Sequence, residues 1–538
     1  MRQLLSIPVS IFLVLNPVWS GAAEAQTPTP TTPIQHVVVI FDENISFDHY
    51  FGIYPKAANL PGQPRFMALP NTPTLNGFSP ALLTNNPNLN TANGAGAANP
   101  FRLNRTQALT ADQSHSYEPE QQSFDHGLMD LFPSKTGAAG GTPITTPPVT
   151  QTTGMVMGYY DGNTVTAMWE YAQHFALNDN SYGTQFGPSS PGAINLISGQ
   201  TNGIIQGTTK NSSGTSNEVA DGQSGFTEIG DADPLNDFCA GSTKFQMNLS
   251  GTNVGNLLNN AGLTWGWFQG GFDLTVTNPN GTTGCSRSTV SPVTGLTEPD
   301  YVPHHEPFQF YASTANPLHT RPSSVQNIGF ADVANHQYDL HDFFDSLNAG
   351  NLAAVSYLKP QSYQNAHPGN SNPLDEQAFV VNVINTLMNS SFWNTTAVII
   401  AYDDSDGWYD HQMGPIVNGS FTSFDALTGA GACGTSGVTP QLNGVGPSAG
   451  LPVSGRCGYG VRQPLLLISP WAKPNYVDHT LTDQTSILLF IENNWNLGKI
   501  GGGSFDALAN PITSMFNFTQ STPQNPNLLI LSTTTGLP

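Results

Sequence analysis

The chain has 538 residues, with 15 lysines and arginines against 37 aspartates and glutamates, so its formal net charge is −22 at pH 7. Such an acidic protein is poorly suited to bind nucleic acid, because phosphate contacts require clustered Lys and Arg. Hydrophobic residues make up 38% of the chain. This fraction is enough to build a large core and argues against intrinsic disorder.

The first 25 residues have the pattern of a signal peptide. Arg2 supplies a positive charge, residues 7–18 are mostly apolar, and Ala23-Glu24-Ala25 matches an A-x-A cleavage site. The apolar stretch is too short to span a membrane. We therefore expect residues 1–25 to be removed and the mature protein to be exported, either to the periplasm or out of the cell, without a transmembrane segment.

A buried strand is predicted at residues 37–41, which read Val-Val-Val-Ile-Phe, and Glu43 and Asn44 follow shortly after it. A continuous apolar run between polar residues is typical of a strand inside a parallel sheet. In α/β folds, functional side chains lie beyond the carboxyl ends of such strands. On its own, the Glu43-Asn44 pair would indicate only the start of a loop.

Helices and strands are then expected to alternate along the chain. The expected helices are 164–175, 191–198, 254–261, one from 373 onward, and 485–494, and the expected strands are 265–269, 352–358 and 465–468. The helix from 373 is the best defined, because Asn372-Pro373 is a strong start signal and an apolar stripe at helical spacing follows it. Stretches rich in Gly, Asn, Pro and Thr at 54–100, 199–249 and 413–456 are expected to be long loops.

A second predicted strand, at residues 397–402, ends in Asp403 and Asp404. Strand 352–358, the helix from 373 and this strand form a β-α-β crossover, so the two strands are expected to be parallel. The carboxylate and amide oxygens at the two acidic strand ends suit a divalent cation, which would also relieve their mutual repulsion. Asp404-Ser405-Asp406-Gly407 resembles part of a calcium loop, but the remaining spacing and the terminal Glu of an EF-hand are missing.

The four cysteines, Cys239, Cys285, Cys433 and Cys457, suit an oxidising compartment. No C-x-x-C pair is present, which disfavours a zinc-thiolate or redox site. The favoured pairing is Cys239 with Cys285 and Cys433 with Cys457, since each bond would close a loop within one insertion. The two other pairings stay open.

Five segments, taken together, resemble the bacterial phosphoesterase family that contains phospholipases C and acid phosphatases. They are 43–52, 187–192, 304–308, 402–411 and 468–472, and they occur in family order over nearly the whole mature chain. The first matches the family signature ENxSFDxYFG, and the last matches ISPWA. The resemblance implies an alkaline-phosphatase-like fold. We therefore expect residues 26–538 to form one α/β domain, a three-layer α/β/α sandwich with a mostly parallel central sheet and long loop insertions.

The resemblance also implies a metal-dependent site. Ser189 falls at the position of the family's nucleophile, although from local sequence alone it would only cap a helix, and Ser190 is the neighbour with which it could be confused. The implied ligands of one divalent cation (Ca, Mg, Mn or Zn) are Glu43, Asn44, Ser189, Asp403 and Asp404. The histidines at family positions that bind phosphate or protonate the leaving group are His115, His305 and His367, with His304 as a competitor of His305.

The leading functional hypothesis is a secreted acid phosphatase that acts on phosphomonoesters through a phosphoserine intermediate. Ser189 and the Asp403-Asp404 pair resemble that branch more than the Thr and Asp-Glu pattern of many phospholipases C. A phospholipase C that cleaves phospholipid phosphodiesters is the second hypothesis. A distant third, suggested by the Gly/Asn/Ser-rich loops and the acidic cluster, is a non-catalytic, cation-dependent carbohydrate-binding protein. The expected partners are small phosphorylated substrates or phospholipid.

Overall fold

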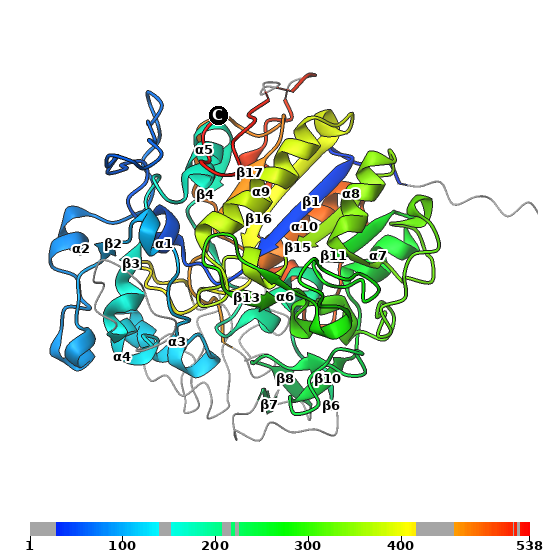
Figure 1. Cartoon of the computed structure of the whole chain (residues 1–538), viewed down its shortest axis with the longest axis horizontal. Helices are drawn as coiled ribbons and strands as arrows, with labels where there is room; N and C mark the ends of the chain where they lie inside the picture. Colours follow the sequence, from blue (N-terminus) through cyan, green and yellow to red (C-terminus); the bar gives the residue numbers. More distant parts are fainter. Residues whose placement is uncertain are drawn as a thin grey trace, which may run out of the picture.

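The computed structural model describes residues 28–138, 152–206, 217–220, 225–415, 457–519, 521–523 and 528–538. An eight-stranded sheet in the order β14-β11-β15-β1-β16-β17-β4-β18 forms its centre (Figure 1). The strands are β1 (His36–Asp42), β4 (Ala176–Asn178), β11 (Trp265–Gln269), β14 (Gln337–Asp339), β15 (Val355–Lys359), β16 (Thr396–Tyr402), β17 (Leu465–Ile468) and β18 (Tyr476–Asp478). The predicted signal peptide lies outside the described residues.

The sheet is mostly parallel, as predicted. The five strands from β14 to β16 run in the same direction, and β4 is parallel to β18. β17 is the exception, since it is antiparallel to both β16 and β4. Antiparallel neighbours need no crossover helix, and the short apolar run of β17 carries no signal of its direction.

Helices cover both faces of the sheet (Figure 1), which confirms the predicted α/β sandwich. α5 (Thr166–His174), α8 (Leu340–Asn348) and α9 (Pro373–Met388) lie on one face. On the other face, α6 (Ser189–Ser198) packs against both α10 (Gln484–Trp495) and α7 (Val254–Asn260). None of the described helices is long and apolar enough to cross a membrane.

The helix expected from residue 373 is α9, and its start follows the sequence signal. The side chain of Asn372 accepts hydrogen bonds from the N–H groups of Leu374 and Asp375, and Pro373 takes the first helical position. The β15-α9-β16 unit is a parallel crossover, but β1 lies between its two strands. The expected strand 352–358 begins three residues later than predicted, and the helix expected at 191–198 begins two residues earlier.

The long insertions contain more regular structure than the sequence indicates. The 54–100 segment includes α2 (Pro80–Thr84) and the short helix η1 (Thr91–Gly96). The 199–249 segment contributes a small sheet of β6 (Ile204–Gln206), β9 (Asp233–Pro234) and β10 (Gln246–Leu249). Of the 413–456 segment, residues 416–456 lie outside the described residues.

Candidate active site

The carboxyl ends of three neighbouring strands bring acidic and basic side chains to one edge of the sheet. Glu43 follows β1, Lys359 ends β15, and Asp403 follows β16. Because β1 lies between the other two strands and all three are parallel, these ends meet although they are distant in sequence. The three residues are at most 2% exposed, so their charges interact in an environment with little water.

Lys359 lies between the two carboxylates. Its Nζ atom is 2.9 Å from Glu43 Oε1 and 3.0 Å from Asp403 Oδ2. Burial alone would lower the pKa of Lys359, but the negative charges of Asp403 and Glu43 outweigh this effect and raise it. The ammonium group is therefore a fixed positive charge inside the site.

His305 contacts Glu43 from the other side. Its Nδ1 atom is 2.7 Å from Glu43 Oε1, and burial lowers the pKa of His305 to about 3. Burial would raise the pKa of Glu43, but His305 and Lys359 together hold it well below its usual range. The 2.7 Å contact with His305 and the 2.9 Å contact with Lys359 thus both favour the ionised form of Glu43. The competing His304 contacts a different carboxylate, with Nδ1 3.4 Å from Asp233 Oδ1.

Asn44 adopts a left-handed backbone conformation, with φ of 65°. A non-glycine residue in this region is uncommon, and such strain is concentrated at functional sites. The Asn44 N–H donates to Asp403 Oδ1 at 3.1 Å, and Nδ2 donates to Asp406 Oδ1 at 3.1 Å. The first bond fixes the backbone and the second fixes the side-chain amide, so that Oδ1 of Asn44 is the atom left for a further partner.

Ser189 is the first residue of α6, and its side chain does not cap the helix. Its Oγ atom donates to Asp404 Oδ2 at 3.2 Å. The helix can approach the acidic loop because residue 192 is a glycine, where a Cβ atom would lie 2.1 Å from the Asp403 carbonyl oxygen. The predicted nucleophile is thus held directly beside the predicted metal ligands.

At the N-terminus of α6, Ser190 already contacts a carboxylate. The N–H and the hydroxyl of Ser190 both donate to Asp231 Oδ1 at 3.0 Å. This carboxylate occupies the Ser190 N–H, which is one of the first-turn donors that a phosphate group could otherwise use. The two neighbouring serines therefore have different partners, since Ser189 contacts Asp404 and Ser190 contacts Asp231.

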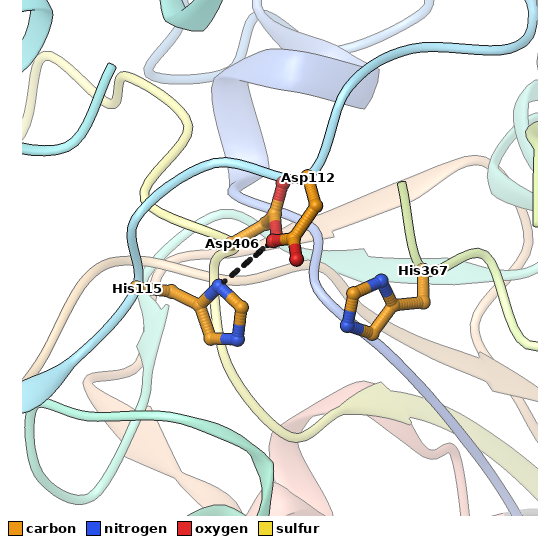
Figure 2. A group of neighbouring side chains, drawn as sticks. All are labelled: Asp112, His115, His367 and Asp406. Atoms are coloured by element: carbon orange, nitrogen blue, oxygen red, sulfur yellow. Dashed lines mark ion pairs between the residues drawn. The ribbon is translucent and has the colours of Figure 1, made fainter. Parts of the chain in front are cut away.

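His115 and His367 come from two different loops and face each other beside Asp406 and Asp112 (Figure 2). Their ring centroids are 5.7 Å apart. His115 Nδ1 is 3.1 Å from Asp406 Oδ1 and 3.4 Å from Asp112 Oδ1. Burial would lower the pKa of both imidazoles, but Asp404 and Asp406 raise that of His115 well above its usual value, and Glu43 and Asp406 raise that of His367. Both rings therefore favour the cationic form.

The residues at the strand ends fit a divalent cation. Glu43 Oε2 and Asn44 Oδ1 are buried and accept no hydrogen bond from any residue that the structure describes, a costly arrangement unless a further partner is bound. Burial also raises the pKa of Asp403 to about 6 and that of Asp404 well above its usual range. Crowded carboxylate and amide oxygens are the ligand set of hard cations. Asp112, His115, His367 and Asp406 also have potential ligand atoms within 4.8 Å of one another.

Residues 34–498 match the family model of the phosphoesterase family. This chain belongs to the phosphoesterase family. The match confirms the resemblance that the sequence motifs indicated. The protein is therefore a hydrolase that acts on phosphoric ester bonds. This activity argues against the alternative of a non-catalytic carbohydrate-binding protein.

Two curated relatives of this phosphoesterase are similar over most of its length. Phospholipase C A of Mycobacterium tuberculosis (strain ATCC 25618 / H37Rv) is 25% identical over 518 residues, which cover 93% of this chain and 81% of the relative. The non-hemolytic phospholipase C of Pseudomonas aeruginosa is 22% identical over 509 residues, covering 92% of this chain and 58% of the relative. Among solved structures, murine ectonucleotide pyrophosphatase / phosphodiesterase 5 aligns with a TM-score of 0.31 and 11% identity, over 66% of this chain and 95% of that one.

The structure brings all the predicted site residues of this phosphoesterase into one region. Sequence reasoning missed three of their neighbours, Lys359, Asp406 and Glu120. Lys359 could have been noticed, because it is the only charged residue in 352–359 and directly follows the predicted strand 352–358. Asp406 lies in the loop that resembles part of a calcium loop, and that resemblance gave no reason to place it beside Asn44. Glu120 belongs to α3 (Tyr117–Phe124) and is brought to the site by the tertiary fold alone.

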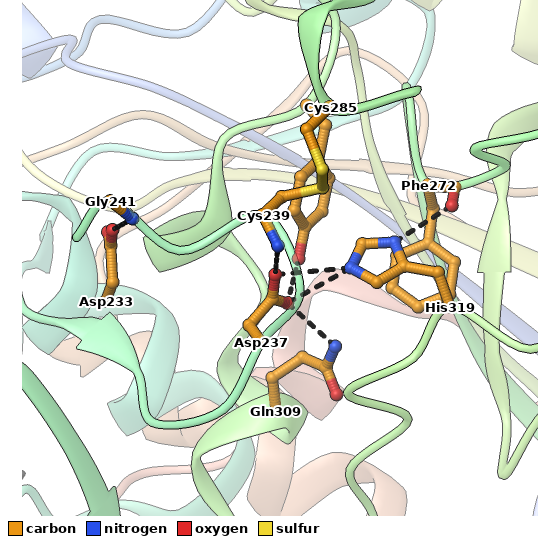
Figure 3. Close-up of a disulfide and its surroundings, with 9 residues drawn as sticks. Asp233, Asp237, Cys239, Gly241, Phe272, Cys285, Gln309 and His319 are labelled. Atoms are coloured by element: carbon orange, nitrogen blue, oxygen red, sulfur yellow. Dashed lines mark hydrogen bonds and ion pairs between the residues drawn. A yellow bond between two sulfur atoms is a disulfide. The ribbon is translucent and has the colours of Figure 1, made fainter. Parts of the chain in front are cut away.

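A second buried Asp-His pair, Asp237 and His319, has a structural role in this phosphoesterase (Figure 3). His319 Nε2 is 3.2 Å from Asp237 Oδ1, and its Nδ1 lies 2.9 Å from the Phe272 carbonyl oxygen. Asp237 also accepts hydrogen bonds from Tyr301, Gln309 and the Cys239 N–H. The pair supports the predicted disulfide Cys239–Cys285, which is present. Cys433 lies outside the described residues, so its pairing with Cys457 stays a prediction.

Proposed function

We propose that this phosphoesterase hydrolyses phosphomonoesters through a covalent phosphoserine at Ser189. The observation that carries the proposal is the 3.2 Å contact between Ser189 Oγ and Asp404 Oδ2, in a buried cluster of charged groups at the carboxyl edge of the sheet. The serine of a phosphoryl-transfer site must lie beside groups that activate it and beside donors that bind the phosphoryl oxygens. His115 and His367 supply such donors close to the same loop.

Charge favours a monoester over a diester as the substrate. A monoester carries one more anionic oxygen, and the raised pKa values of His115 and His367 favour cationic imidazoles beside the site. A diester replaces that oxygen with an alkoxy group and leaves one donor without an acceptor. Interactions that strengthen as charge develops on the phosphoryl group contribute to rate, whereas uniform binding does not.

Glu43, Asn44, Asp403 and Asp404 would hold the divalent cation, with Ser189 as a further ligand. When bound, the cation would lower the pKa of the Ser189 hydroxyl and neutralise charge on the phosphoryl oxygens. The chain's own residues account for the rest. Asn44 is held by its hydrogen bonds to Asp403 and Asp406. Lys359 balances part of the negative charge of Glu43 and Asp403.

The reaction requires two displacements at phosphorus. In the first, Ser189 Oγ loses its proton along its hydrogen bond to Asp404 and bonds to phosphorus, while the bond from phosphorus to the leaving oxygen breaks. The leaving oxygen takes a proton from the imidazolium of His115 or His367 and departs as an alcohol. In the second, water gives a proton to the imidazole that protonated the leaving group and bonds to phosphorus, while the bond from phosphorus to Ser189 Oγ breaks. Ser189 Oγ takes back its proton from Asp404, and inorganic phosphate is released.

A comparison of two nitrophenyl substrates tests the proposal. We expect kcat/KM on p-nitrophenyl phosphate to exceed that on p-nitrophenylphosphorylcholine. A tenfold or greater preference for the choline diester would instead support a phospholipase C. That second candidate is favoured by one observation, because the similar curated relatives carry the name phospholipase C. Phosphatidylcholine serves as the third substrate, since it presents the diester in a lipid.

We also propose that the protein is exported after removal of residues 1–25, with residues 26–538 forming the mature domain. Arg2, the apolar run 7–18 and the Ala23-Glu24-Ala25 site support this proposal, as does the disulfide Cys239–Cys285, which requires an oxidising compartment. N-terminal sequencing of the protein secreted by a bacterial host tests it. A mature chain that begins near Gln26 is expected, and a retained Met1 in the exported fraction would contradict it.

A further inference from the structure

Glu120 is a buried carboxyl group that contacts the two loops on which the proposed chemistry depends. It lies on α3, which begins just after His115, and it is 2% exposed. Its Oε2 atom accepts a hydrogen bond from the Gly187 N–H at 2.9 Å, and its Oε1 atom accepts one from Ser405 Oγ at 2.5 Å. One carboxyl group therefore bridges the loop before Ser189 and the loop after Asp404.

The Gly187 contact fixes the turn that leads into Ser189. Gly187 has φ of 119°, a conformation that favours glycine. A turn of this kind has no intrinsic preference for one orientation, because glycine is conformationally permissive. The bond from its N–H to Glu120 restricts the peptide group two residues before the proposed nucleophile, and it thereby restricts the direction from which Ser189 enters α6.

The Ser405 contact fixes the acidic loop in the same way. Ser405 follows Asp404 directly, and its Oγ atom also accepts the Gly407 N–H at 3.0 Å. Asp406, the next residue, donates its N–H to Asp404 Oδ1 at 2.6 Å. Ser405 is thus the point where the loop that carries Asp404 and Asp406 is attached to α3.

Burial of the Glu120 carboxyl group lowers the stability of the fold unless its interactions compensate for the lost hydration. Glu120 makes no ion pair with a Lys or Arg within the described ranges, and its two closest donors are the Gly187 N–H and the Ser405 hydroxyl. Burial outweighs these donors, the Gly407 N–H and the charge of His115, which all favour the ionised form, and it raises the pKa of Glu120 to about 7. Transfer of an ionised carboxyl group from water to such a place costs several kcal/mol. The two donors lie on separate loops that must keep a fixed spacing if Ser189 Oγ is to stay 3.2 Å from Asp404.

We propose that Glu120 is a positioning residue for phosphoryl transfer, whose two oxygens hold the Ser189 turn and the Asp404 loop at the spacing that the reaction requires. This inference rests on the proposed phosphoserine mechanism. Glu120 does not contact the phosphoryl group itself. Its loss should therefore slow the formation of phosphoserine without removing the residues that bind the metal or the substrate.

The test compares E120A, E120Q and S405A with E118A as the matched control. Glu118 lies on the same helix but is exposed, and it contacts Gln122 there. Each variant is assayed with p-nitrophenyl phosphate for kcat, KM and the burst of nitrophenol in the first turnover, and its metal content is measured. We expect E120A to lower kcat and the burst rate by roughly 10- to 100-fold, because small misplacements of reacting groups have effects of this size. KM and metal content should stay close to the wild-type values.

E120Q should recover most of the lost rate. Its Oε1 atom can accept the Gly187 N–H, while its Nε2 atom donates to the second lone pair of Ser405 Oγ. S405A removes one of the two contacts and should be intermediate, and E120A/S405A should be no slower than E120A, since the two residues act through one interaction. If E120A does not fold, E120Q and S405A still test the proposal. A wild-type rate for S405A would contradict the proposed link between Glu120 and the Asp404 loop.

The inference is overturned if E120A forms phosphoserine at the wild-type rate or if E120Q is as slow as E120A. Failure of the proposed function has a different signature. In that case the wild type shows no phosphoserine in acid-quenched samples, and S189A keeps its activity. E118A should match the wild type in every measurement, and a loss as large as that of E120A would attribute the effect to α3 as a whole.

Discussion

Ser189 Oγ donates a hydrogen bond to Asp404 Oδ2 across 3.2 Å, although the two residues are 215 positions apart in the chain. The contact exists because α6 begins at Ser189 and packs against the loop that follows β16. Gly192 allows this close approach, since any side chain there would collide with the Asp403 carbonyl group. A helix start and a strand end are thereby combined into one proposed reaction centre.

Replacement of Ser189 by alanine should abolish hydrolysis and leave the metal bound. The serine is the proposed attacking group, and loss of a nucleophile lowers kcat by on the order of 10³-fold or more. Nitrophenol release and elemental analysis of the purified variant measure the two effects. S190A is the control, because Ser190 is bonded to Asp231 and should keep most of the activity. Near wild-type turnover by S189A would reassign the nucleophile to Ser190 or to water.

Replacement of Asp403 or Asp404 by asparagine should lower both metal content and activity. Each change keeps the volume of the side chain but removes one of the three carboxylates available to the cation, the third being Glu43. Elemental analysis after gel filtration measures the bound metal. D345N is the control, because the Asp345 side chain is 54% exposed and far from this loop in sequence. A fully active wild type without metal, or variants that retain the metal, would contradict the assignment.

Replacement of Lys359 by methionine should destabilise the metal-free protein more than the metal-loaded protein. Without metal, the variant would bury the carboxylates of Glu43 and Asp403 with no cation beside them, and loss of one partner from a buried ion pair costs about 3–5 kcal/mol. A bound divalent cation would compensate for part of this loss. Urea denaturation with and without metal measures the difference.

The matched control for this experiment is K473M. Lys473 is partly exposed and contacts the ring of Tyr476, with Nζ 4.4 Å from the centroid. A cation–π contact near the surface contributes about 0.5–1 kcal/mol. Its loss should be the same in both metal states. An equal destabilisation of K359M with and without metal would show that Lys359 does not balance the charge of the metal site.

The positions of the acidic side chains at the strand ends could be predicted, because they follow from short local patterns in the sequence. The apolar runs of β1 and β16 are buried, and polar side chains that follow a buried strand of a parallel sheet are directed to the same edge. The start of α9 could be predicted for the same reason, since the neighbouring residues Asn372 and Pro373 specify it. The direction of β17 could not be predicted, because a four-residue apolar run fits either orientation.

Contacts that depend on tertiary packing could not be predicted from the sequence. Asp406 meets Asn44 across 362 positions, and Glu120 meets Ser405 across 285. No periodicity or spacing encodes such pairs, and both residues lie in segments whose local pattern is that of an ordinary loop or surface helix. Ser189 lies between these two cases. The family resemblance made it the candidate nucleophile, whereas its local sequence indicated only a helix cap.

A last prediction concerns the buried ion network beside the site, in which His411 Nδ1 lies 2.6 Å from Asp48 Oδ2. The charged groups that face this imidazole are Asp48, Asp410 and Arg462. Burial and Arg462 would lower the pKa of His411, but the two carboxylates outweigh them and raise it. Because the folded pKa exceeds the unfolded value of about 6.5, the stabilisation is fully present below that pH and is lost as pH rises through the folded pKa.

H411Q should therefore lower the free energy of unfolding more at pH 6 than at pH 9. Urea denaturation of wild type and variant at each pH gives the difference, and Asp48, Asp410 and Arg462 are present in both proteins. H479Q is the control, because His479 also pairs with an aspartate, with Nδ1 2.7 Å from Asp179 Oδ1, but its side chain is 65% exposed. Solvent weakens such a surface pair to between 0 and about 1 kcal/mol. A penalty for H411Q that is equal at both pH values would mean that the imidazole acts through its shape and neutral hydrogen bonds, not through its charge.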